Sequence, residues 1–230
     1  DSVDTDVIKT YGAPMRENAG FMVLSGNLFD SALMKTSVIS QDFRERFLSE
    51  PGNEGVYEAR AVVFEGPEDY HDRINDPTLE IDEKSILFIR GVGCVGYPGS
   101  AEVVNMQPPD AVIRQGINHL PTVGDGRQSG TSESPSILNA SPESVVGGGL
   151  AHLQTGDMVK LDLNARVLNA VVDDAEWQAR IDAWTPPELR NQTPWQEIYR
   201  KNVGQLADGG CLELATAYQK VGQDLPRDNH

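Results

Sequence analysis

Apolar and polar residues alternate along the chain up to residue 172 in the manner of half-buried β-strands. The run SILFI at 85–89 is continuously apolar, which is typical of a strand buried on both faces. Residues 158–172 alternate on both sides of Asn164-Ala165-Arg166 and predict a β-hairpin. The full set of predicted strands is a strand–turn–strand over 21–39, then 56–64, 85–89, 120–123 and the hairpin over 158–172.

Helical patterns are short before residue 172 and dominate after it. Ser40 and Asp173-Asp174 are residues that cap helix N-termini, and a proline at 109 is tolerated in a first helical turn. The predicted helices cover about 41–48, 68–74, 110–116, 175–184, 194–206 and 212–221. Strands first and helices last predict an α+β fold: a β-rich barrel or sandwich with peripheral C-terminal helices, rather than alternating βαβ units. No repeat or linker divides residues 1–230, which we take as one domain.

Composition excludes several classes of protein. The chain has 19 Lys and Arg and 35 Asp and Glu, and its net charge of −16 argues against nucleic-acid binding. No apolar run approaches the ~18 residues of a membrane helix, and no signal peptide is visible in the acidic start DSVDTD, so we expect no membrane association. Two distant cysteines, Cys94 and Cys211, form no disulfide framework and favour a reducing, cytoplasmic compartment. Without an initial Met, the chain reads as a piece of a longer protein.

Two glycine-rich loops are the candidates for chemistry. The first, GVGCVGYPGSAE at 91–102, follows an apolar run as a dinucleotide loop would, but Pro98 interrupts it and no long helix follows. The simpler interpretation is a tight turn at a barrel corner. The second, GDGRQSGTSESPS at 124–136, is rich in hydroxyls and has no large apolar residue that could fill a core. It is either a solvated turn or a loop around a polar ligand, in which Arg127 pairs with a carboxylate.

Single residues leave further alternatives open. Glu102, at the end of the first loop, is either a helix-start acid or one ligand of a hard cation such as Mg²⁺. The four histidines form no zinc-binding pair, and a serine hydrolase using Ser129 would need a histidine base within reach. Trp177, Trp184 and Trp195 are assigned to packing, in the core or at an interface.

Four segments in order resemble the C-terminal domain of the dihydroxy-acid and sugar-acid dehydratase family. They are GFMVLSGNLFDSALMKTSVIS (20–40), LFIRGVGCVGYPGSAEVVNMQPP (87–109), PTVGDGRQSGTSESPSILNASPE (121–143) and VVGGGLAHLQTGDMVKLDLN (145–164). The resemblance covers about residues 7 to 225. Within the family, QSGTSESPSILNASPE is more similar to the aldonate branch, which acts on acids such as L-arabonate or D-xylonate, than to the branched-chain dihydroxy-acid branch.

The resemblance implies a swivelling β/β/α domain with a barrel-like core and a hydro-lyase activity. Such an enzyme converts a 2,3-dihydroxy acid to a 2-keto-3-deoxy acid with Mg²⁺ and an iron–sulfur cluster, expected to be [2Fe-2S]. By resemblance, Ser129 is the base for the C2 proton and Thr131 lines the site. Tyr97, Pro98 and Arg127 bind substrate together with these two hydroxyls, and Glu102 binds Mg²⁺.

The cluster ligands of the family lie in an N-terminal part that is absent from this sequence. We therefore expect that part as a partner, assembly as a homodimer or homotetramer, and neither cluster binding nor turnover by this chain alone. Cys94 and Glu133 depart from the family pattern, with Cys94 where relatives often have proline and Glu133 where they often have glycine. The alternatives are a stand-alone, non-catalytic binding module of the same fold and a dihydroxy-acid dehydratase of branched-chain amino-acid synthesis.

Overall fold

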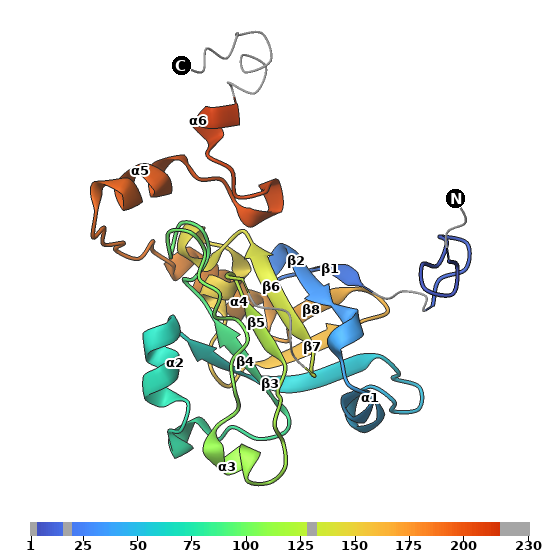
Figure 1. Cartoon of the computed structure of the whole chain (residues 1–230). Coiled ribbons are helices and arrows are strands. Elements are labelled where there is room, and N and C mark those ends of the chain that lie inside the picture. Colours follow the sequence, from blue (N-terminus) through green and yellow to red (C-terminus); the bar gives the residue numbers. More distant parts are fainter. Residues whose placement is uncertain (1–3, 16–19, 128–132, 217–230) are drawn as a thin grey trace.

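The computed structural model describes residues 4–15, 20–127 and 133–216, and its centre is a closed barrel of eight strands (Figure 1). Around the barrel the strands follow the order β1-β2-β6-β5-β4-β3-β7-β8. Their bounds are β1 Phe21–Gly26, β2 Phe29–Lys35, β3 Val56–Phe64, β4 Ser85–Ile89, β5 Thr122–Gly124, β6 Ser136–Ser141, β7 Met158–Asp162 and β8 Val167–Ala170.

Strand direction divides the barrel in two. β3, β4, β5 and β6 are parallel neighbours, whereas β1–β2, β2–β6, β3–β7 and β7–β8 are antiparallel. A parallel pairing of Ser25 with Val167 closes the barrel between β1 and β8. The carboxyl ends of the four parallel strands therefore meet at one rim of the barrel.

Short helices lie around the barrel. α2 stands in the crossover from β3 to β4, and α3 in the crossover from β4 to β5, while α5 and α6 extend away from the barrel (Figure 1). The helices are α1 Gln41–Phe47, α2 Pro67–Arg73, α3 Asp110–Ile113, α4 Asp174–Ala183, α5 Pro194–Asn202 and α6 Glu213–Thr216. No helix in these described ranges has the length and apolar content needed to span a membrane.

Two apolar clusters hold the fold, and β4 contributes to both. Ile86 and Phe88 belong to the larger cluster, which also contains the buried apolar side chains of β1, β2, β7 and β8. Leu87 and Ile89 belong to the second cluster with Val62 and other residues on the opposite face of the sheet. All five residues of β4 are buried, which confirms the strand predicted from SILFI as buried on both faces.

The α+β fold class and the barrel are confirmed, as are the 158–172 hairpin and the Ser40 cap, whose side chain accepts a hydrogen bond from the Phe43 amide. The three parallel pairings, β3–β4, β4–β5 and β5–β6, were not anticipated, and β6 was missed. The helix predicted over 194–206 ends at Asn202, because Val203 leaves the helix and pairs with Leu212. The helix predicted over 212–221 is present at Glu213–Thr216; from 217 on it lies outside the described residues.

The three tryptophans differ in their surroundings. Trp177 packs against the larger apolar cluster, and both Trp177 and Trp184 lie near the ring of His152. Trp195 is 77% exposed, so it is not in the core, and its assignment to an interface stays a prediction. It is the second residue of α5, a helix with no buried residue.

Candidate active site

The two glycine-rich loops meet at the rim where the parallel strands end. The loop that begins at Gly91 follows β4, the loop that begins at Asp125 follows β5, and Pro142-Glu143-Ser144 follows β6. In sheets with parallel strands, ligands commonly bind outside the carboxyl ends of the strands. The structure thus brings the segments selected from the sequence to a position suited to a ligand site.

Backbone hydrogen bonds join the first loop to the second. Arg127 N–H donates to the Ala101 carbonyl at 3.0 Å, and the Val104 N–H donates to the Arg127 carbonyl at 3.1 Å. Glu102 and Arg127 are therefore opposite each other in a short parallel bridge, and both are exposed. Arg127 Nε also donates to the Ser100 carbonyl at 2.8 Å, which fixes the course of its side chain.

Asp125 is a fully buried carboxylate that binds three segments together. Its oxygens accept hydrogen bonds from the amides of Gly91 (3.1 Å) and Val92 (2.9 Å) in the first loop. They also accept from the amide (2.9 Å) and hydroxyl (2.6 Å) of Ser144, after β6. Four donors satisfy this buried charge, so Asp125 anchors the base of both loops.

Glu143 is a second buried carboxylate, 2% exposed, and it holds the middle of the first loop. Its oxygens accept from the amides of Val95 (2.9 and 3.1 Å) and Gly96 (2.8 Å), and from Nε2 of Gln205 (3.0 Å). The Glu143 amide donates back to Oε1 of Gln205 at 2.8 Å. Burial raises the pKa of Glu143, while the hydrogen bonds from Gly96 and Val95 favour the charged form.

The C-terminal helical part also contacts the first loop. Arg200 of α5 donates through Nε to the Val95 carbonyl at 2.8 Å and through Nη2 to the Gly96 carbonyl at 3.1 Å. The peptide groups of Val95 and Gly96 are therefore held from both sides, with Glu143 on their N–H groups and Arg200 on their carbonyls.

Two glycines are required by close approach in these loops. A Cβ at Gly93 would lie 2.5 Å from Oε2 of Glu143, and one at Gly126 would lie 2.8 Å from the Ala101 carbonyl oxygen. Both distances are too short for real contacts. Glycine at these positions lets the loops lie against the buried carboxylate and against each other.

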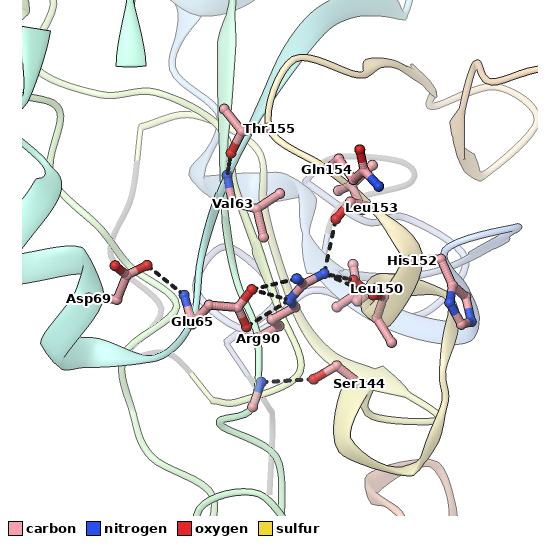
Figure 2. A network of polar contacts seen from close by, with 12 residues as sticks. Val63, Glu65, Asp69, Arg90, Ser144, Leu150, His152, Leu153, Gln154 and Thr155 are labelled. Carbon is pink, nitrogen blue, oxygen red and sulfur yellow. Dashed lines mark hydrogen bonds and ion pairs between the residues drawn. The ribbon is translucent and has the colours of Figure 1, made fainter. Parts of the chain in front are cut away.

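A polar network borders the same rim and is shown in Figure 2. Arg90, directly after β4, pairs with Glu65, directly after β3. Its Nη1 donates to the carbonyls of Leu150 (2.8 Å), Ala151 (3.1 Å) and Leu153 (2.9 Å). The guanidinium thus attaches the parallel strands to the segment between β6 and β7.

With this geometry established, comparison with known proteins identifies the family. The chain matches the family described as "Dihydroxy-acid/6-phosphogluconate dehydratase C-terminal" over residues 6–211. The chain belongs to this dehydratase family. The loops after β4, β5 and β6 all lie inside the matched region.

Several named dehydratases are similar to the chain over nearly its whole length. It is 60% identical to D-xylonate dehydratase of Caulobacter vibrioides over 99% of this chain and 38% of the relative. It is 34% identical to L-arabinonate dehydratase of Rhizobium leguminosarum bv. trifolii, over 98% of this chain and 37% of the relative. It is 32% identical to dihydroxy-acid dehydratase of Lachnoclostridium phytofermentans, over 92% of this chain and 36% of the relative. The chain therefore spans less than two fifths of the length of these relatives.

The dehydratase site residues expected from the sequence fall into two groups. Tyr97, Pro98 and Glu102 lie on the loop after β4, where Tyr97 is 46% exposed and Pro98 half-buried, and Arg127 lies beside Glu102. Ser129 and Thr131 lie outside the described residues, two and four positions beyond Arg127 in the sequence. Their assigned roles remain predictions.

Glu133 lies apart from Glu102 and Arg127. Its carboxylate is 3.5 Å from Nε2 of His119, and its carbonyl accepts from the Ser40 amide at 2.8 Å. The next residue, Ser134, donates to the Leu120 carbonyl, before the start of β5. Glu133 is therefore at the amino end of β5, whereas Arg127 follows its carboxyl end, and an effect on the rim is not supported for this side chain.

The described residues differ in how well they fit Mg²⁺ and an iron–sulfur cluster, the two cofactors that the resemblance implies. No group of three or more His, Cys, Asp or Glu side chains in the described ranges is arranged to hold a metal ion. Glu102 is an exposed carboxylate to which no described residue donates a hydrogen bond, so it fits the role of one oxygen ligand for Mg²⁺. The two cysteines do not fit a cluster: Cys94 is buried, burial raises the pKa of its thiol, and Cys211 is exposed.

Sequence analysis did not select Asp125, Glu143, Gln205 or Arg200. Asp125 and Glu143 stood inside the quoted motifs, as the acids of GDGR and SPE, and an acid among glycines and prolines was the available signal. Gln205 and Arg200 carried no local signal, because their partners lie 62 and 105 residues away in the sequence.

Proposed function

We propose that this chain is the C-terminal domain, over residues 1–230, of a hydro-lyase that dehydrates an aldonate such as D-xylonate or L-arabonate. The product is the corresponding 2-keto-3-deoxy acid. The observation that carries the proposal is the meeting of the loops after β4 and β5 at the rim, with Glu102 and Arg127 side by side and exposed. Similarity to a D-xylonate dehydratase at 60% identity supports the aldonate as substrate class.

The reaction needs a base for the C2 proton and a cationic group for the substrate carboxylate, and the loops after β4 and β5 contain residues that can supply both. The C2–H bond breaks, its electron pair forms a C2–C3 double bond, and the C3 hydroxyl leaves as water after gaining a proton. The enol then tautomerises to the 2-keto acid. In our proposal Ser129 takes the C2 proton, and Arg127 holds the substrate carboxylate through the part of its guanidinium not bound to Ser100.

Tyr97, Pro98 and Thr131 complete the substrate pocket in this proposal. Tyr97 and Pro98 stand on the segment whose peptide groups Glu143 and Arg200 hold, so their backbone is placed before substrate arrives. Such preorganisation favours a bound geometry close to that of the reaction.

We assign a cofactor to this chain only where its residues fit that cofactor. Glu102 would supply one ligand to Mg²⁺, which when bound stabilises negative charge on the substrate carboxylate and the developing enolate. The cysteines do not fit an iron–sulfur cluster, so we assign the cluster to the N-terminal part of the longer protein and derive no step from it here. Cytoplasmic location and homodimeric or homotetrameric assembly belong to the same proposal, as does the absence of turnover by this chain alone.

Dehydration by the full-length protein tests the proposal. The protein is purified without oxygen, supplied with Mg²⁺, and offered D-xylonate, L-arabonate and a branched-chain 2,3-dihydroxy acid, with 2-keto acid measured. We expect faster turnover of an aldonate, and a loss of kcat of about 10³-fold or more in Ser129→Ala, because the proton acceptor is removed.

Ser49→Ala is the matched control. Ser49 is an exposed hydroxyl that donates to the Arg44 carbonyl at the end of α1, so this variant should retain wild-type turnover. Faster turnover of the branched-chain acid would refute the aldonate assignment. A folded wild-type protein, loaded with its cofactors, that dehydrates none of these acids would refute the activity and favour a binding module.

A further inference from the structure

We propose that Glu143 is a positioning residue for the substrate pocket: it sets the place of Tyr97 and Pro98 by binding the peptide groups immediately before them. The inference rests on the proposed function, because it concerns the same rim. It assigns a role in substrate binding to a buried carboxylate that does not itself reach the substrate.

The contacts of Glu143 point to the loop and not to the barrel core. Its two oxygens accept from the amides of Val95 and Gly96, the two residues that precede Tyr97. In the same turn the Tyr97 amide donates to the Gly93 carbonyl at 2.9 Å. A displacement of Val95 and Gly96 would therefore move the Tyr97 side chain directly.

The rest of the loop is already fixed at its two ends. Asp125 holds Gly91 and Val92 at the beginning, and the backbone bonds of Arg127 hold Ala101 and Val104 at the end. Between these anchors Glu143 and Arg200 hold the peptide groups of Val95 and Gly96, and Tyr199 bonds the Gly99 backbone. Removal of the Glu143 charge should thus affect the substrate wall more than the base of the loop or Glu102.

The contacts of Gln205 require a carboxylate, and not an amide, at position 143. Its Nε2 donates to Oε1 of Glu143, and its Oε1 accepts from the Glu143 amide. A glutamine at 143 that keeps its oxygen on Val95 and Gly96 turns its NH₂ toward the NH₂ of Gln205, so two donors face each other. A flip of Gln205 would relieve this clash but would lose the bond from the amide of residue 143.

The test measures KM and kcat of the full-length enzyme for the aldonate that it turns over. Glu143→Gln should raise KM about tenfold and change kcat of the folded enzyme less than about threefold, because the substrate wall is displaced and the reacting groups remain. The double variant Glu143→Gln/Gln205→Glu moves the carboxylate across the pair. It restores a donor–acceptor match, and KM should return to within about threefold of wild type.

Asp157→Asn is the matched control. Asp157 is a mostly buried carboxylate paired with Arg180 at 2.7 Å, and among the described residues it makes no hydrogen bond to the loop 91–102, so its loss should lower Tm and leave KM unchanged. A purely structural role for Glu143 predicts the same result for Glu143→Gln. An unchanged KM in Glu143→Gln, or a double variant no better than the single one, would overturn the proposal.

Hydrogen exchange separates this inference from the proposed function. In the full-length protein, Glu143→Gln should speed exchange of the amides at 95–97 at least tenfold, with 91–92 protected as in wild type. If the wild type turns over no aldonate, the proposed function fails, and exchange decides whether Glu143 holds the loop. Unchanged exchange at 95–97 would show that it does not.

Discussion

At the scale of single residues, His152 shows how burial governs the charge of a side chain. It is 7% exposed, its Nδ1 has no hydrogen-bond partner within the described ranges, and the rings of Trp177 and Trp184 lie 5.8 and 6.3 Å away. Burial lowers the pKa of this histidine, a hydrogen bond with the Gly147 backbone opposes that shift in part, and the nearby positive charge of Arg90 adds to it. The folded protein therefore favours neutral His152.

This depressed pKa predicts a pH-dependent stability. Below about pH 6.5 the unfolded chain binds a proton at this position that the folded chain resists, so the free energy of unfolding falls as pH falls, by at most about 1.4 kcal/mol per pH unit. His152→Gln should reduce the fall in Tm between pH 7.5 and 5.5. His71→Gln, at an exposed position, should leave it unchanged. Equal pH profiles for wild type and His152→Gln, measured by thermal unfolding, would contradict the assignment.

At the scale of elements, the loop after β4 is shaped by what it must contact. Gly93 lies against Glu143, which cannot retreat because its oxygens bind Val95, Gly96 and Gln205. A side chain at 93 must displace either the carboxylate or the loop. Gly93 of GVGCVG thus serves contact with a buried acid, and Gly96 serves close approach to the Gly91 carbonyl within the same loop.

Gly93→Ala tests whether close approach to Glu143 requires a glycine at position 93. The new Cβ would overlap the Glu143 side chain, and overpacking of this kind costs about 1–3 kcal/mol. Gly12→Ala is the control, since no atom lies within 4 Å of a Cβ built there. Urea unfolding should show a lower free energy of unfolding for the first variant only. Equal values for the two variants would mean that Glu143 or the loop moves aside with no loss in the free energy of unfolding.

At the scale of the whole molecule, Arg90 connects parts of the barrel that are distant in the sequence. It joins the ends of β3 and β4 to the carbonyls of residues 150–153 (Figure 2). The Glu65 side chain is 62% exposed, so the ion pair contributes little by itself. The hydrogen bonds to the three carbonyls contribute more to the free energy of unfolding, because Leu150 and Leu153 are buried and water cannot readily replace the guanidinium.

Arg90→Gln should therefore lower the free energy of unfolding by about 2–4 kcal/mol, since buried acceptors lose a charged donor. Arg46→Gln is the matched control. Its ion pair with Glu83 is 40% and 45% exposed, and its loss should cost less than about 1 kcal/mol. Denaturant unfolding of the two variants makes the comparison. A loss for Arg90→Gln as small as that of the control would show that the carbonyls find other partners.

Prediction from sequence succeeded where the signal was local and failed where partners were distant. The strand β6, Ser136–Ser141, was missed because its pattern is short and begins and ends with serine. The structure explains the buried hydroxyl of Ser136: its Oγ pairs with Oγ1 of Thr122 on β5 at 2.8 Å. A serine in a buried strand is stable only with such a partner, and the sequence does not indicate which residue supplies it.

By itself, the sequence determined the barrel strands other than β6, the hairpin over 158–172 and the dehydratase motifs, because alternation and motif spacing are properties of consecutive residues. Tertiary structure decided the order of the strands and the rim where the loops meet. It also decided the burial of Asp125 and Glu143, whose loop partners Val92 and Val95 are 33 and 48 residues away. Such contacts depend on how strands pair across the barrel, and that pairing is not encoded in any short stretch of sequence.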